Sequence, residues 1–218
     1  NDIPAVAIVD PELMYSMPKG LTAATGMDAL THAIESYITP GAWVMSDMFE
    51  LKAIEMIAQN LKAAVDNGKD VAAREAMSQA QYIAGMGFSN VGLGIVHSMA
   101  HPLGAFYDTP HGVANALLLP YVMEYNAESP AAPKYIHIAK AMGVDTTGMS
   151  EAEGVKAAVE AVKALSASIN IPQKLHEINV KEEDIPALAV AAFNDVCTGG
   201  NPRPTSVADI EALYRKAF

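Results

Sequence analysis

The sequence predicts an all-α fold, and three observations support that prediction. Of the 218 residues, 51% are hydrophobic and 18% are charged, which is typical of a compact domain. Beyond residue 18, apolar side chains recur at helical spacing in almost every segment. The sequence contains no internal repeat and no low-complexity tract. We therefore expect one domain of about eight or nine helices over residues 1–218.

The opening segment is the exception to the helical pattern. Residues 3–9 form an apolar run that ends at Asp10-Pro11, a pattern typical of a short buried strand. A lone strand cannot satisfy its own edges. We therefore expect residues 1–10 to be a junction strand whose sheet lies in an N-terminal domain absent from this chain.

Three segments of the first half have apolar side chains at helical spacing: residues 21–37, 46–67 and 71–86. Gly26 predicts a break in the first, because glycine is a poor helix former. Ser46 is the expected N-cap of the second, and Asn67-Gly68 should end it. The third leads into a glycine-rich joint, residues 85–94.

Six further segments are expected to be helical: residues 95–107, 113–125, 135–142, 150–168, 182–196 and 206–218. The first two are apolar on nearly every side, so they should lie at the centre of the fold. Ser150 and Glu153 have the spacing of a capping box. Glycine and proline predict a loop over residues 197–204.

Charge and cysteine content narrow the classes of function. The 25 acidic and 14 basic side chains give a formal net charge of −11, so no nucleic-acid partner and no anionic membrane surface is expected. No apolar run reaches the roughly 18 residues that a membrane span needs. The only cysteine, Cys197, excludes an internal disulfide and fits a reducing, cytoplasmic compartment.

His97, His101 and His111 lie close together in an apolar stretch of the sequence. A buried imidazole without a partner costs about 1–3 kcal/mol, so these rings need shared partners. His97 and His101 are four residues apart and share a helix face, and the turn at Pro110 returns His111 toward them.

Asp28 and His32 form a second pair with four-residue spacing. Together with His97, His101 and His111, this face would offer three or four nitrogen ligands and one anionic oxygen. Such a set suits Fe²⁺ or Zn²⁺ better than Ca²⁺ or Mg²⁺. Each side chain alone is more often a hydrogen-bonded core or helix residue, but the clustering favours a mononuclear metal site.

Two stretches, residues 24–35 and 94–112, closely resemble the signature sequences of the iron-containing (group III) alcohol dehydrogenase family. Residues 87–94 and 195–203 are most similar to the branch that contains the lactaldehyde reductases, or propanediol oxidoreductases. The resemblance covers the whole chain. It implies the helical C-terminal domain of that family, separated from the α/β domain that binds the dinucleotide.

The resemblance also implies roles for individual side chains. The metal ligands would be Asp28, His32, His97 and His111. His101 would stay outside the coordination shell, between the nicotinamide and the substrate, in a proton relay. Phe88 and Cys197 would line the substrate pocket. The implied ion is Fe²⁺, although the donor set also accepts Zn²⁺ or another divalent ion.

The activity implied is metal-assisted hydride transfer between NAD(P) and small alcohols, diols or aldehydes. This chain would supply the metal-binding half and would be inactive without the missing dinucleotide-binding domain. The alternative is a stand-alone helical metal-binding domain without redox activity, such as a metal-dependent hydrolase with an adjacent His-Asp pair. No His-Asp dipeptide occurs in the sequence. The preferred alcohol, the choice of NAD or NADP, and assembly into a homo-oligomer stay open.

Overall fold

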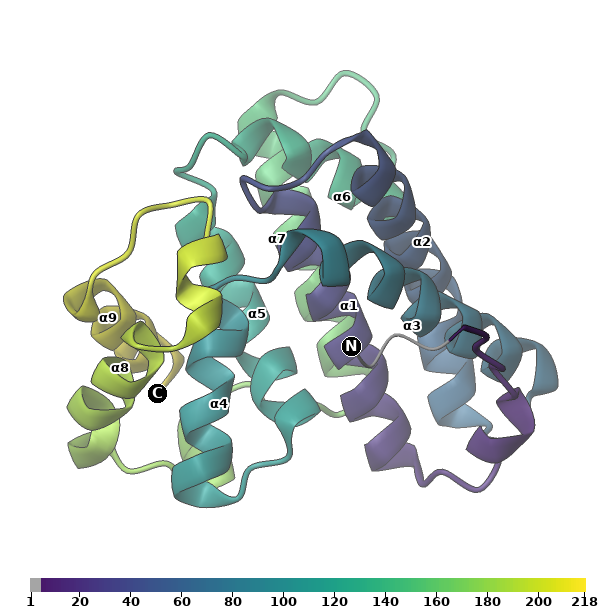
Figure 1. The fold of residues 1–218 in the computed structure, drawn as a ribbon, viewed down its shortest axis with the longest axis horizontal. Helices are drawn as coiled ribbons and strands as arrows, with labels where there is room; N and C mark the ends of the chain where they lie inside the picture. Colours follow the sequence, from purple (N-terminus) through teal and green to yellow (C-terminus); the bar gives the residue numbers. More distant parts are fainter. Residues whose placement is uncertain (1–4) are drawn as a thin grey trace.

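The computed structural model describes residues 5–218, and this part of the chain is helical and contains no strand (Figure 1). The α-helices are α1 (Lys19–Ile38), α2 (Val44–Asp66), α3 (Val71–Val91), α4 (Ile95–Tyr107), α5 (His111–Asn126), α6 (Tyr135–Ala141), α7 (Glu151–Ser168), α8 (Ile185–Phe193) and α9 (Val207–Ala217). Short 3₁₀ helices are η1 (Pro11–Met14), η2 (Ala132–Lys134), η3 (Leu175–Ile178), η4 (Glu182–Asp184) and η5 (Val196–Gly200). The predicted all-α class is confirmed.

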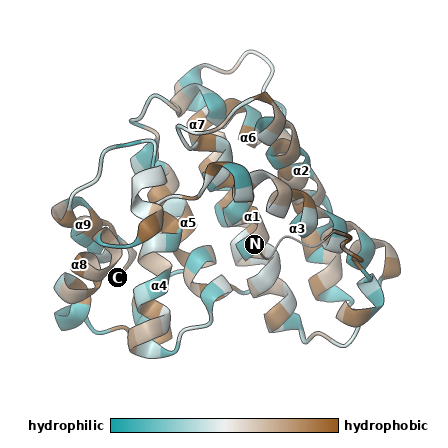
Figure 2. Cartoon of the chain, in the orientation of Figure 1, coloured by the Kyte–Doolittle hydropathy of each residue, from teal (hydrophilic) through white to brown (hydrophobic). Residues whose placement is uncertain are grey.

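Helix α1 is the organising element of the domain. It packs against α2 and α3 on one side and against α5 on the other, and α4 packs on α5 (Figure 1). Helix α8 packs on α4, and α9 packs on α8 and α5, at the end of the molecule opposite α2 and α3. Hydrophobic and hydrophilic residues alternate around most helices, as expected when each helix buries one face (Figure 2). The apolar faces meet in one core cluster.

The two segments expected at the centre do contribute heavily to this core. Val96, Met99 and Leu103 of α4 and Leu118 and Leu119 of α5 are fully buried. The predicted capping box also forms, because the Ser150 N–H donates to Glu153 Oε2 at 2.8 Å and the Glu153 N–H donates to Ser150 Oγ at 3.4 Å.

The predicted break at Gly26 is wrong, because α1 continues through this residue. Gly26 is buried where α1 crosses α2, and a Cβ added there would lie 2.2 Å from Leu61 Cδ1. The glycine therefore allows two helices to pack closely and does not end one of them.

The glycine-rich joint is also more helical than predicted, since α3 extends to Val91. Gly87 lies inside this helix above Glu50 of α2, where a Cβ would be 1.9 Å from Glu50 Oε1. The helix ends at Gly92, whose φ of 86° is readily adopted only by glycine. Close packing with α2 thus explains a glycine that the sequence pattern assigned to a joint between helices.

Two other boundaries differ from the prediction. Helix α2 begins at Val44 with Trp43 as its N-cap, and the Ser46 hydroxyl accepts the Trp43 N–H at 3.0 Å from within the first turn. Ser46 is therefore not the N-cap. The segment expected as one helix over residues 182–196 is divided into η4, α8 and the start of η5, which also occupies part of the predicted 197–204 loop.

The expected junction strand is not found in the described residues. Residues 5–10 have no regular secondary structure, and Val6 and Ile8 are 76% and 89% exposed. Residues 1–4 of the expected strand lie outside the described part. A strand needs a neighbour to pair with, and residues 5–218 supply none. No helix in this range is long and apolar enough to cross a bilayer.

Candidate metal centre

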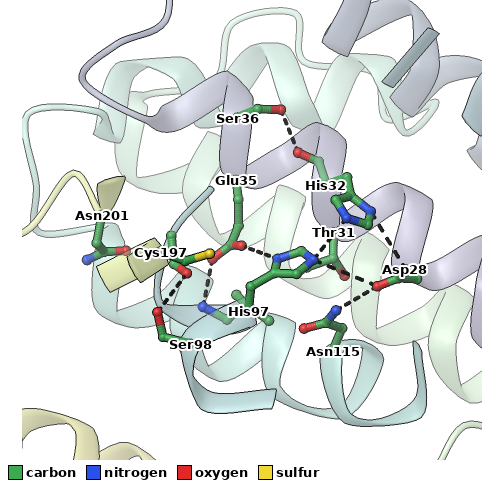
Figure 3. Close-up of polar contacts among 12 residues, drawn as sticks. Asp28, Thr31, His32, Glu35, Ser36, His97, Ser98, Asn115, Cys197 and Asn201 are labelled. Atoms are coloured by element: carbon green, nitrogen blue, oxygen red, sulfur yellow. Dashed lines mark hydrogen bonds and ion pairs between the residues drawn. The ribbon is translucent and has the colours of Figure 1, made fainter. Parts of the chain in front are cut away.

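The side chains predicted to bind a metal come together between α1, α4 and the first turn of α5. Figure 3 shows three of them, Asp28, His32 and His97. Asp28 Oδ1 lies 3.9 Å from His97 Nε2 and 3.5 Å from His111 Nε2. Asp28 Oδ2 lies 3.8 Å from His32 Nδ1, and the Nε2 atoms of His32 and His97 are 3.1 Å apart. Asp28, His97 and His111 each offer one ligand atom within 4.8 Å of the others.

Two glycines allow the helices to approach closely enough for this convergence. Gly112 follows His111, and a Cβ on it would lie 2.3 Å from the Ala24 carbonyl oxygen of α1. Gly94 precedes α4, and a Cβ there would lie 2.9 Å from Glu35 Oε1. Because contacts this short cannot be made by a larger residue, each glycine helps to bring its histidine against α1.

Glu35 contacts the candidate site directly, and sequence reasoning gave it no role. Its Oε2 lies 2.6 Å from His97 Nδ1, and its Oε1 accepts the Val96 N–H at 2.6 Å. Both the Glu35 and His97 side chains are 2% exposed. A carboxylate on Nδ1 holds a ring proton there, so that in the neutral ring Nε2 is the free nitrogen and faces Asp28, as in many metal sites. The available signal was an acidic residue inside an apolar helical run.

Asn115 is the second residue that sequence reasoning missed. It is fully buried on α5, one turn after His111. Its Nδ2 donates to Asp28 Oδ1 at 2.6 Å and lies 3.0 Å from His111 Nε2. Asn115 Oδ1 is buried without a hydrogen-bond partner among the described residues. Asn115 therefore orients the carboxylate that all three clustered imidazoles face.

The electrostatic environment keeps the cluster suitable for a cation. Burial, together with the neighbouring His97, lowers the pKa of His32 to about 4. Burial also lowers the pKa of His111. Burial opposes ionisation of His97, but the hydrogen bond and charge of Glu35 outweigh it and raise the pKa of His97. Neutral His32 and His111 retain lone pairs, so the nitrogen-rich donor set fits Fe²⁺ or Zn²⁺.

His101 lies beside this cluster and is 41% exposed. Its ring stacks on His111 with centroids 5.4 Å apart, and its Nδ1 lies 2.7 Å from Asp195 Oδ2. Burial opposes ionisation of Asp195, but hydrogen bonds from the Cys197 N–H and from His101 lower the pKa of this carboxyl. His101 thus lies next to the cluster and is not among the three residues that offer a ligand atom within 4.8 Å of one another; its role outside the metal ligands stays a prediction.

Phe88 and Cys197 occupy different surroundings. The Phe88 ring stacks on His32 with centroids 4.4 Å apart, and Phe88 lines a cavity of about 450 Å³ that also reaches Asp28 and His32. Cys197 is half-buried beside Asp195 and does not line this cavity. Burial, with the Asp195 charge, raises the pKa of the Cys197 thiol to about 12, so it is a poor nucleophile.

Known proteins share this sequence and fold. Residues 22–218 match the family model described as "Fe-containing alcohol dehydrogenase family, C-terminal". The chain belongs to this family.

Several full-length relatives are similar to the whole chain. Lactaldehyde reductase of Escherichia coli K12 is 59% identical over 218 residues, which are 100% of this chain and 56% of that protein. NAD-dependent methanol dehydrogenase of Bacillus methanolicus is 46% identical over 99% of this chain and 56% of its own length. The crystal structure of a 1,3-propanediol oxidoreductase aligns with a TM-score of 0.97 at 47% identity, covering 99% of this chain and 56% of that one. The chain thus spans about half the length of these relatives.

Proposed function

We propose that this chain is the metal-binding half of an NAD(P)-dependent alcohol dehydrogenase that interconverts small alcohols or diols and aldehydes. The observation that carries the proposal is the convergence of Asp28, His32, His97 and His111 in a member of the iron-containing family. The similar proteins named above act, by their names, on lactaldehyde, methanol and 1,3-propanediol, which supports a small alcohol or aldehyde as substrate.

Asp28, His32, His97 and His111 would hold the ion, Fe²⁺ or another divalent cation such as Zn²⁺. When bound, such an ion supplies Lewis-acid polarisation of an alcohol or carbonyl oxygen.

The protein side chains supply charge, orientation and a route for the proton. Asp28 contributes the negative charge, and the Glu35 carboxylate keeps His97 Nε2 free to coordinate. Phe88 stacks on one face of the His32 ring and so helps to fix its orientation. His101, next to the ligands but outside them, relays the proton of the substrate hydroxyl.

A dinucleotide-binding domain is the partner that this proposal requires. The remaining length of the relatives accommodates such a domain, and without it we expect the isolated chain to bind metal but not to catalyse hydride transfer. We further propose a cytoplasmic enzyme. Family membership disfavours the alternative of a stand-alone metal-dependent hydrolase.

Removal of one ligand tests the metal site. In the full-length protein, His97→Ala should lose most of the bound metal, because Asp28, His32 and His111 alone leave the shell open. Elemental analysis after anaerobic Fe²⁺ loading measures the stoichiometry, and oxidation of NADH with lactaldehyde measures activity. His137→Ala is the control, since His137 hydrogen-bonds Tyr37 away from the cluster. Unchanged metal stoichiometry in His97→Ala would refute the assignment.

A further inference from the structure

We propose that Asp195 is a positioning residue for His101, which it holds with the ring proton on Nδ1 and with Nε2 open to the substrate. This inference rests on the proposed function, because it assigns a partner to the proposed proton relay. Asp195 follows α8 and is not one of the proposed metal ligands.

The contact itself fixes the direction of the hydrogen bond. Asp195 Oδ2 lies 2.7 Å from His101 Nδ1, and a carboxylate can only accept. His101 Nδ1 must therefore carry the proton. In a neutral ring this leaves Nε2 as an acceptor, available for a substrate hydroxyl.

Asp195 is held in place independently of His101. Its Oδ1 accepts the Cys197 N–H at 2.9 Å, which makes Asp195 the N-cap of η5, and Ser98 Oγ lies 3.5 Å from the same oxygen. Thr198 Oγ1 joins this loop to Ser98 Oγ at 2.8 Å and to the Ala192 carbonyl at 2.8 Å. Contacts with α4 and η5 therefore hold the Asp195 carboxylate in place without help from the His101 imidazole.

Successive turns of α4 carry the same arrangement in two different settings. His97 has Glu35 on its Nδ1, and both side chains are 2% exposed. His101, one turn later, has Asp195 on its Nδ1, but these side chains are 41% and 17% exposed. The enclosed pair suits a permanent ligand. The open pair suits a group that exchanges protons with substrate and solvent.

Loss of the Asp195 carboxylate should affect the chemical step more than binding. An amide at this position can present either its oxygen or its NH₂ group, so the His101 proton is no longer confined to Nδ1. We expect kcat of full-length Asp195→Asn to fall by about 10–100-fold, with KM changed less than about threefold, since the variant loses part of the roughly 10²–10⁴-fold that positioned proton transfer contributes. Metal content should not change, because neither residue is a proposed ligand.

A double-mutant cycle distinguishes positioning from a general structural role. Asp195→Asn should reduce kcat strongly in the wild-type background but by less than about twofold in a His101→Ala background. Asn194→Ala is the matched control, because it removes, next to Asp195, a side-chain hydrogen bond to the Val190 carbonyl and leaves the Asp195–His101 contact. Equal losses in both backgrounds, or an equal loss in Asn194→Ala, would overturn the proposal.

A spectroscopic measurement tests the proposed protonation state of the His101 ring without any need for catalysis. In Zn²⁺-loaded, ¹⁵N-histidine-labelled full-length protein, the His101 ring nitrogens should show protonated Nδ1 and unprotonated Nε2. Asp195→Asn should convert this signature to a mixture of tautomers. An unchanged signature would overturn the role of Asp195 even if the enzyme is active. An inactive wild-type enzyme with the expected signature would instead contradict the proposed function alone.

Discussion

Two buried glutamates, Glu35 on α1 and Glu50 on α2, have opposite surroundings. Glu35 is 2% exposed, and its two oxygens meet the Val96 N–H and His97 Nδ1, each at 2.6 Å. Glu50 is 0% exposed, and neither of its oxygens has a hydrogen-bond partner among the described residues. The hydroxyl of the nearby Ser36 donates instead to the His32 carbonyl at 2.5 Å (Figure 3).

The difference shows that burial alone does not decide what a carboxyl group does. At Glu35, donors from α4 stabilise the charge and use it to orient a proposed metal ligand. At Glu50, burial raises the pKa to about 8, with a smaller effect from Asp47. One site is organised for a charged group, whereas the other favours a neutral one.

The largest contrast is expected from the same substitution at the two positions. In Glu35→Gln the amide oxygen can still accept the hydrogen bond from the Val96 N–H. The NH₂ group then faces His97 Nδ1, and the ring proton moves to Nε2. That proton would face the cation, so we expect metal affinity to fall by about 10–100-fold. A competition titration of Zn²⁺ against a fluorescent chelator measures the change.

Glu50→Gln is the control for that experiment, because Glu50 contacts none of the proposed ligand atoms. It should leave Zn²⁺ affinity within about twofold of wild type. Equal affinity in the Glu35 and Glu50 variants would show that the Glu35–His97 hydrogen bond has no part in metal binding.

The next largest effect is expected on stability, from the packing of α3 against Glu50. In Gly87→Ala the new Cβ would lie 1.9 Å from Glu50 Oε1, and the side chain must be displaced. We expect the free energy of unfolding to fall by about 2 kcal/mol, within the usual range for overpacking. Gly85→Ala, on the same helix with nothing within 4 Å of its Cβ, should be neutral or slightly stabilising. Urea denaturation of both variants checks this, and equal stabilities would contradict it.

The smallest effect is expected on how the stability of the fold depends on pH. Between pH 4.5 and about 8 the unfolded Glu50 is ionised while the folded one keeps its proton, so the folded protein loses stability as pH rises through this window. Glu50→Gln removes the ionisation, and its stability relative to wild type should increase by about 1 kcal/mol or more from pH 5 to pH 8. Urea denaturation at both pH values measures it. Glu55→Gln, exposed on the same helix, should show no such gain.

Much of the fold and the candidate site could be predicted from the sequence. Helical spacing located α4 at residues 95–107, and four-residue spacing placed Asp28 beside His32 on one face. Glycines were misjudged, because Gly26 and Gly87 serve contacts with another helix and local sequence does not reveal such contacts. Trp43 was missed as an N-cap because the hydroxyl that accepts its N–H lies three residues later.

The sequence by itself determined the helices and the proposed ligand residues, because periodicity and i, i+4 spacing are local properties of the chain. Only the tertiary structure decided which carboxyls have partners. Glu35 meets His97 across 62 residues and Asp195 meets His101 across 94, while Glu50 meets no donor among residues 5–218. Those pairings depend on how closely α1, α4 and η5 pack, and glycines at the crossings set that distance.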